Sequence, residues 1–129
     1  MYKWYHNAME TKHSLLKSFG FAFEGLKAEV IKGRNFRIQI AAGVLASILG
    51  VILKLSAEEW LDLVIIITLV LVLELVNTSI EALVDLVSPE IQEKAKLAKD
   101  VAAATVLVAS VGSVAIGVLV FLPKLLAIF

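Results

Sequence analysis

The stretch from Trp60 to Val87 constrains this chain most, because it is apolar enough to enter a membrane yet carries acidic side chains in its second half. A carboxylate at the centre of a bilayer-spanning helix costs about 2.5 to 3.5 kcal/mol on insertion scales, so several on one helix indicate a function. At about 100° per residue, the polar residues of this half share one stripe about 100° wide. They are Glu74, Asn77, Thr78, Glu81 and Asp85. The pattern predicts a spanning helix with lipid on its Leu, Ile and Val side and a polar, protein-lined cleft, the candidate active site, on the other.

The composition is that of a small all-α integral membrane protein. The chain has 129 residues, 60% of them hydrophobic, and a soluble protein of this size rarely needs so many long apolar runs. We predict membrane spans over residues 37–54, 60–87 and 98–122; the first is slightly short and is completed by the snorkelling side chains of Arg37 and Lys54. The absence of cysteine excludes disulfides and thiolate metal sites, and the formal charge of zero does not suggest nucleic acid binding.

Residues 14–32 have a different pattern from the spans. Apolar residues from Leu15 to Val30 gather within about 100° of one helix face, while Lys17, Glu24 and Lys27 lie opposite. The pattern alone fits an amphipathic helix on the membrane surface and an ordinary packed helix equally well, and the neighbouring spans favour the surface helix. Residues 1–13 are predicted to form an N-terminal tail, and residues 14–129 a single domain.

Local signals indicate where helices end and where they pack closely. Ser88 precedes a proline, which disfavours the helical conformation and ends the second span. Ser88 is also a suitable N-cap, and Pro89 a suitable first residue, for the helix that leads into the third span. Small residues four apart in the first span predict close helix packing. They are Gly43 with Ser47 and Ala46 with Gly50.

The basic residues predict the orientation. Seven of the twelve lie before residue 38 and three, Lys94, Lys96 and Lys99, lie between the second and third spans, whereas the loop between the first two spans has one lysine. The positive-inside rule therefore places the N-terminus in the cytoplasm and the C-terminus outside. The Asp85 end of the polar stripe and the Lys99–Asp100 pair then both open on the side where nucleotides are available.

The stripe has the parts that phosphoryl transfer requires. Glu74, one or two turns below the membrane surface, is a candidate general base. Glu81, two turns nearer the cytoplasm with Asn77 between them, offers oxygen ligands to a divalent cation, and Lys99 at the mouth offsets phosphate charge. The acceptor is then a lipid, because only a lipid presents a hydroxyl at that depth. The chain has neither a GxxxxGK[ST] nor a GxGxxG motif, which excludes a conventional nucleotide fold.

The same stripe also fits a function without catalysis. An isolated glutamate in a span more often forms part of an ion or proton path, or a hydrogen bond between helices, than serves as a catalytic base. From spacing alone, a small oligomeric membrane protein with an ion or proton path remains an alternative.

Longer motifs resemble one family. The segment ELVNTSIEALVDLV from Glu74, followed by AKDVAAATVLV from Ala98, resembles the central motif of the bacterial diacylglycerol kinase and undecaprenol kinase family. The segment EGLKAEVIKGRNFRIQI from Glu24 is similar to the family's surface helix and entry into the first span. FLPK at Phe121 to Lys124 is similar to the C-terminal end of its Gram-positive type members. The resemblance covers nearly the whole chain after about Ser14.

The resemblance implies a homotrimer of three-span subunits, each with an amphipathic surface helix, and active sites shared between neighbouring subunits. It implies ATP as co-substrate, Mg²⁺ as cofactor, Glu74 as the base that takes the proton of the lipid hydroxyl, and Glu81 as a metal ligand. The residues that it places at the nucleotide are Asn77, Glu81, Glu90, Gln92, Lys99 and Asp100. The residues that it places at the lipid are Arg37, Glu74 and Ala103.

This sequence departs from the family at three positions. The family usually has a metal-binding glutamate two residues before the Asn of its ERN-like segment, and here that position is Gly33. Glu29, one turn earlier, is the candidate to replace it as a metal ligand. Gln39 stands where the segment usually has histidine, and Gln92 where the nucleotide loop often has histidine.

The expected function is that of an ATP-dependent, Mg²⁺-requiring lipid kinase of the bacterial inner membrane. The RNFRI segment and the FLPK ending look more like undecaprenol kinases, so undecaprenol is the expected acceptor and undecaprenyl phosphate the product. A diacylglycerol kinase that makes phosphatidic acid is the alternative within the family.

Overall fold

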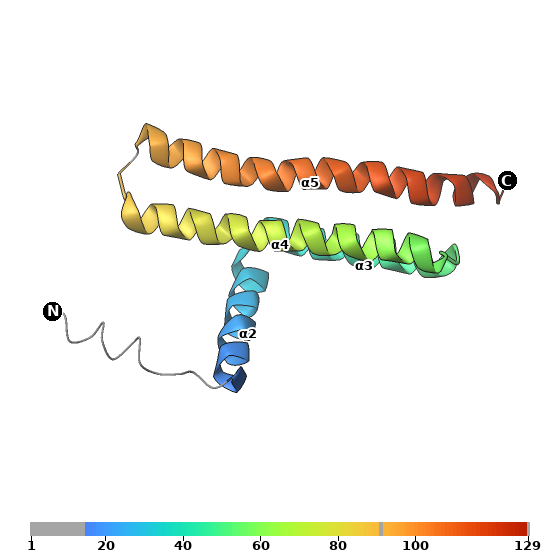
Figure 1. Ribbon diagram of the computed structural model, residues 1–129, viewed down its shortest axis with the longest axis horizontal. Coiled ribbons are helices and arrows are strands. Elements are labelled where there is room, and N and C mark those ends of the chain that lie inside the picture. The colour runs from blue at the N-terminus through green and yellow to red at the C-terminus, as the bar shows by residue number, and fades with distance from the viewer. Residues whose placement is uncertain (1–14, 91, 129) are drawn as a thin grey trace. The chain divides into compact units, whose positions relative to one another are not determined.

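The computed structural model describes residues 15–90 and 92–128, and within them the fold is entirely helical (Figure 1). The helices are α2 (Leu15–Lys32), α3 (Arg34–Ile52), α4 (Ala57–Val87) and α5 (Glu93–Leu126). The predicted tail of residues 1–13 lies outside the described residues. The chain divides after Gly33 into two units, the first containing α2 and the second the other three helices.

The first unit confirms the helix predicted over residues 14–32. Along α2 the aromatic side chains of Phe19, Phe21 and Phe23 are exposed, whereas Glu29 is buried. The backbone N–H of Gly33 donates a hydrogen bond of 2.7 Å to the carbonyl oxygen of Glu29, which closes the last turn of the helix. An added Cβ at Gly33 would collide with the Glu29 carboxylate, so this side chain lies folded over the glycine.

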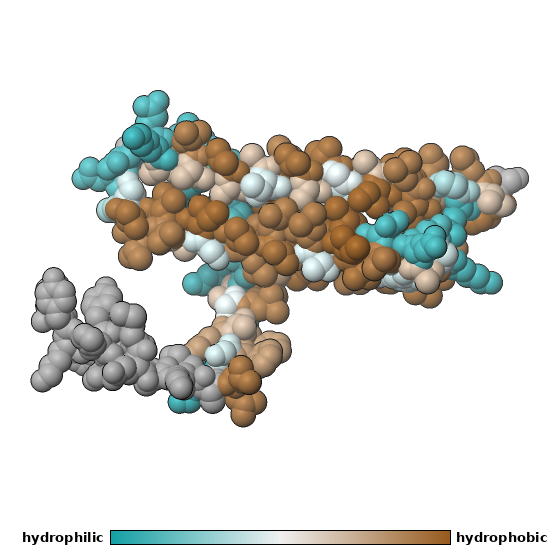
Figure 2. All heavy atoms as spheres, in the orientation of Figure 1, coloured by the Kyte–Doolittle hydropathy of each residue, from teal (hydrophilic) through white to brown (hydrophobic). Residues whose placement is uncertain are grey.

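In the second unit α3, α4 and α5 run in alternating directions, and α4 packs against both of the others (Figure 1). All three helices are long and apolar enough to cross a membrane, which confirms the three predicted spans, each with boundaries a few residues different from those predicted. The surface of the bundle is mostly hydrophobic along its length, with hydrophilic residues gathered at its two ends (Figure 2). Side chains such as Val108 and Leu119, 72% and 74% exposed, belong in lipid or against other protein. The chain is therefore a multi-pass integral membrane protein.

The packed core lies at the end of the bundle where α3 turns into α4. Leu55, Leu63 and Val120 form its buried centre, with Trp60 and Phe121 against them. Close approach requires the small residues predicted for α3: a Cβ at Gly50 would lie 3.1 Å from the Trp60 ring, and one at Gly43 would lie 3.1 Å from Ile67. These contacts confirm close helix packing in the first span.

Polar contacts fix the start of α4. Ser56 and Glu59 form a reciprocal capping box: the Ser56 hydroxyl accepts from the Glu59 N–H at 3.3 Å, and the Glu59 carboxylate accepts from the Ser56 N–H at 2.7 Å. The same carboxylate pairs with Lys124 near the end of α5 at 3.0 Å. Lys124, noted in the sequence only as part of FLPK, therefore ties the two helices together at this end.

The connection between α4 and α5 corrects one prediction. The second span does end before Ser88, but Ser88 does not cap the next helix, which begins only at Glu93 with Gln92 as its N-cap. The Ser88 N–H instead bonds to the carbonyl of Val84, and its hydroxyl donates to the carbonyl of Glu90 at 3.1 Å. Because the hydroxyl is used to close this short turn, it does not initiate a helix at Pro89.

Candidate active site

The predicted polar stripe lies on α4 and changes from buried to exposed along its length. Glu74 and Asn77 are only 4% and 8% exposed, Glu81 is half-buried, and Asp85 is exposed. This gradient follows from the helical spacing, since each residue is about one turn further toward the α4–α5 connection than the last. The stripe therefore extends from a carboxylate that is shielded from water, that of Glu74, to one that water reaches, that of Asp85.

Glu74 faces a cavity of about 350 Å³ between the three helices of the second unit. Asn77 and Ala103 also line this cavity, as do the apolar side chains of Ile38, Val106 and Leu107. The structure therefore brings together two of the three predicted lipid-binding residues, Glu74 and Ala103. Arg37, the third, is exposed and is not among the residues that line this cavity.

The Glu74 carboxylate has a partner that the sequence did not indicate. The amide nitrogen of Gln39, on α3, donates a hydrogen bond of 3.0 Å to Glu74 Oε2. The sequence marks Gln39 only as a replacement for the family's usual histidine. No spacing rule links two residues on different helices, so only the packing of α3 against α4 reveals the pair.

Asn77 lies between Glu74 and Glu81 on the stripe and contacts the Glu81 carboxylate. Its amide nitrogen donates to Glu81 Oε1 at 3.2 Å, while its Oδ1 is buried and accepts no hydrogen bond from the residues that the structure describes. Carboxylate and carbonyl oxygens are the ligand types that suit Mg²⁺, so the donor groups of Glu81 and Asn77 would suit a magnesium ion. Within residues 15–90 and 92–128, no three His, Cys, Asp or Glu side chains gather as a metal cluster.

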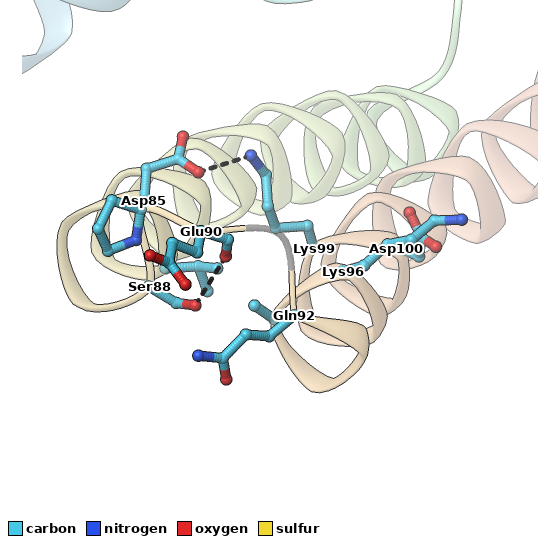
Figure 3. A pocket seen from close by; sticks show the side chains of 10 residues that line it. Asp85, Ser88, Glu90, Gln92, Lys96, Lys99 and Asp100 are labelled. Carbon is cyan, nitrogen blue, oxygen red and sulfur yellow. Dashed lines mark hydrogen bonds and ion pairs between the residues drawn. The ribbon is translucent and has the colours of Figure 1, made fainter.

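A second cavity, of about 340 Å³, lies at the α4–α5 connection (Figure 3). Its lining includes four of the six residues predicted to bind the nucleotide. They are Glu90, Gln92, Lys99 and Asp100. The other two, Asn77 and Glu81, lie further along α4 toward Glu74 and do not line this cavity.

Lys99 and Asp85 point toward one another across this cavity (Figure 3). Lys99 Nζ lies 2.9 Å from Asp85 Oδ1, in an ion pair whose side chains are 36% and 65% exposed. The sequence placed Asp85 on the polar stripe without a role. The contact spans two helices and a turn, which periodicity within α4 does not predict.

Comparisons with known proteins point to one family. The family model described as prokaryotic diacylglycerol kinase matches residues 20–121. The chain is 42% identical over 109 residues to the undecaprenol kinase of Bacillus subtilis (strain 168), covering 84% of this chain and 89% of that protein. It is 39% identical over 123 residues to a diacylglycerol kinase of Synechocystis sp., covering 95% of this chain and 70% of that one. The diacylglycerol kinase of Escherichia coli (strain K12) is 33% identical over 100 residues, which cover 78% of this chain and 82% of that protein.

Proposed function

Because the chain belongs to the prokaryotic diacylglycerol kinase family, it is a lipid kinase, and we propose that it transfers the γ-phosphate of ATP to the hydroxyl of undecaprenol. The observation that carries the mechanism is the burial of Glu74 against a cavity between three spanning helices, whose other lining residues are half polar and half apolar. Such a cavity suits the end of a lipid chain that carries a single hydroxyl.

In the proposed reaction Glu74 accepts the proton of the lipid hydroxyl as the oxygen attacks the γ-phosphorus. The new O–P bond forms while the bond between the γ-phosphorus and the β-bridging oxygen breaks, and its electron pair leaves with ADP. Lys99, at the cavity by the α4–α5 connection, offsets the charge of the phosphates. Glu90, Gln92 and Asp100 line the same cavity and are proposed to contact the nucleotide.

Glu81 and Asn77 would hold Mg²⁺, which when bound neutralises phosphate charge. The hydrogen bond from Asn77 Nδ2 to Glu81 Oε1 holds the two side chains together. The position of Asn77, one turn from Glu74 and one turn from Glu81, lets it align the phosphate with the base.

Glu29 is proposed as a further metal ligand in place of the carboxylate that the family usually has at position 33. Within the first unit its carboxylate occupies the space that a side chain on Gly33 would need. Glu29→Ala should therefore raise the Mg²⁺ concentration needed for half-maximal rate, and Glu24→Ala on the same helix should not. An unchanged Mg²⁺ dependence in Glu29→Ala would refute this assignment.

The assembly is proposed to be a homotrimer, with the N-terminus and the α4–α5 connection in the cytoplasm. The exposed apolar side chains of α3, α4 and α5 provide surface for contacts between subunits as well as for lipid. Arg37 does not line the Glu74 cavity of its own chain, and its proposed contact with the lipid lies outside that cavity.

Diacylglycerol is the second candidate acceptor, because the relative from Synechocystis, named diacylglycerol kinase, aligns with 95% of this chain. The deciding experiment offers undecaprenol and diacylglycerol separately, in mixed micelles, to purified protein with MgATP labelled in the γ-phosphate. Preferential labelling of undecaprenol is the expected result. Preferential labelling of diacylglycerol would keep the mechanism and change the product to phosphatidic acid. The ion-path alternative has no support from the family, whose members compared above are kinases.

A further inference from the structure

The contact between Gln39 and Glu74 joins two helices at the point of greatest burial on the polar stripe. In the part of the chain that the structure describes, Gln39 is the hydrogen-bond partner of the Glu74 carboxylate, and the two residues are separated by 35 positions. The contact therefore exists only when α3 and α4 pack in this register. A residue that fixes the orientation of the proposed base has to contact the Glu74 carboxylate at this point.

The chemistry of the two groups fixes which way the Gln39 amide points. An ionised carboxylate only accepts hydrogen bonds, so the amide must turn its nitrogen toward Glu74 Oε2. Its oxygen, Oε1, is then left buried with no hydrogen-bond partner among the described residues. Leaving a buried acceptor unpaired is unfavourable, and native structures do so where the group has a function or where a ligand or water completes it.

The same cavity contains a second amide in the same state. Asn77 Oδ1 is also buried and unpaired, and both Asn77 and Gln39 line the cavity that Glu74 faces. Each amide uses its nitrogen on a carboxylate, Gln39 on Glu74 and Asn77 on Glu81. The lining contributed by α3, α4 and α5 contains one ionisable side chain, Glu74, and the nearest carboxylate along the stripe is Glu81.

We propose that Gln39 is the positioning residue of the base: it binds Glu74 Oε2 so that Oε1 is presented to the lipid hydroxyl, and its own unpaired oxygen accepts a hydrogen bond from a donor in the occupied cavity. This inference rests on the proposed function. Proton transfer breaks the O–H bond of the lipid and forms an O–H bond on Glu74 Oε1, while Gln39 remains neutral throughout. A glutamine holds the base without adding a second group that titrates beside it.

Two nearly isosteric substitutions test the proposal. Gln39→Met removes both the donor and the unpaired oxygen. Gln39→Glu keeps the shape and places a second carboxylate against Glu74, and two carboxylates in contact cannot both ionise readily. Ser47→Ala serves as the control on the same helix, because the Ser47 hydroxyl donates to the Gly43 carbonyl within α3 at 2.8 Å.

The measurements are kcat and KM for the lipid alcohol and for MgATP across pH, with MgATP binding and thermal unfolding in micelles as checks of folding. In Gln39→Met we expect kcat to fall about 10- to 100-fold with the KM for MgATP changed less than about twofold, since a mispositioned base affects the chemical step. In Gln39→Glu we expect the acid limb of the kcat profile to move to higher pH by about one unit or more. Ser47→Ala should retain the kcat and pH profile of the unmodified protein.

The outcomes separate this proposal from the proposed function. If Gln39→Met keeps its kcat within about twofold, or if Gln39→Glu folds and its acid limb stays in place, Gln39 does not position the base. If Gln39→Met fails to fold, the Gln39→Glu profile alone decides. If the unmodified protein phosphorylates neither lipid alcohol, the proposed function itself is wrong. If it does and Glu74→Gln remains active, Glu74 is not the base and Gln39 positions nothing.

Discussion

The ion pair between Lys99 and Asp85 raises the question of which partner acts on the nucleotide. Both side chains are substantially exposed, and exposed pairs contribute about 0.2 to 1 kcal/mol. The pair can therefore orient Lys99 without holding it away from a phosphate, with which the lysine forms a stronger, charge-assisted hydrogen bond.

Substituting each partner distinguishes their roles. Lys99→Met should lower kcat/KM for MgATP about 10- to 100-fold, since a hydrogen bond to a charged group contributes about 1.5 to 3 kcal/mol. Asp85→Asn should lower it less than about fivefold, because only a weak exposed pair is lost. Steady-state kinetics with varied MgATP measures both. An Asp85→Asn defect as large as that of Lys99→Met would mean that Asp85 itself contacts the nucleotide or its metal.

At the residue scale, the sequence predicts which side chains share one face of a helix. It does not predict which side chains of other helices they contact. Helical periodicity placed Glu74, Asn77 and Glu81 on one face, and the structure has them there, joined by the Asn77–Glu81 contact. Gln39 and Asp85 received no role, since their contacts depend on the packing of α4 against α3 and α5. The catalytic and nucleotide roles come from family resemblance and stay predictions.

At the scale of elements, small residues let α3 approach the start of α4. A Cβ on Gly50 would lie 2.9 Å from Leu55 and 3.1 Å from the Trp60 ring, so neighbours in the packed core must shift. Gly50→Ala should reduce the free energy of unfolding by about 1 to 3 kcal/mol through overpacking. Thermal unfolding in micelles measures this. Gly20→Ala is the control, because an added Cβ there meets nothing within 4 Å; equal destabilisation by both substitutions would contradict the packing argument.

The helices themselves were largely predictable, because long apolar runs and the proline after Ser88 mark their extents. The connection between α4 and α5 was not. Ser88 and Pro89 have the residue types of a helix start, yet the hydroxyl of Ser88 bonds to Glu90 and the helix starts at Glu93. Residue preference at a cap is outweighed here by the turn that places α5 antiparallel to α4.

At the scale of the whole molecule, the orientation in the membrane rests on the distribution of lysine and arginine. The chain has no cysteine, so single cysteines introduced at Ala57 and at Lys94, both exposed, report the side directly. In spheroplasts with an intact cytoplasmic membrane, a membrane-impermeant maleimide should label Ala57→Cys. It should leave Lys94→Cys unlabelled until the spheroplasts are lysed. The reverse pattern would place the nucleotide cavity on the wrong side of the membrane for a kinase that uses cytoplasmic ATP.

The central claim is that Glu74 is the base in phosphoryl transfer to a membrane lipid, and Glu74→Gln tests it most directly. The matched control is Glu58→Gln, the same substitution at an exposed position in the first turn of the same helix. The measurement is transfer of labelled phosphate from MgATP to lipid, together with the Kd for MgATP. Loss of the base should lower kcat about 10²- to 10⁴-fold in Glu74→Gln, with the Kd within about twofold and Glu58→Gln unaffected. A Glu74→Gln protein that keeps more than about a tenth of the turnover would contradict the account, because removal of a general base should cost far more than tenfold in rate.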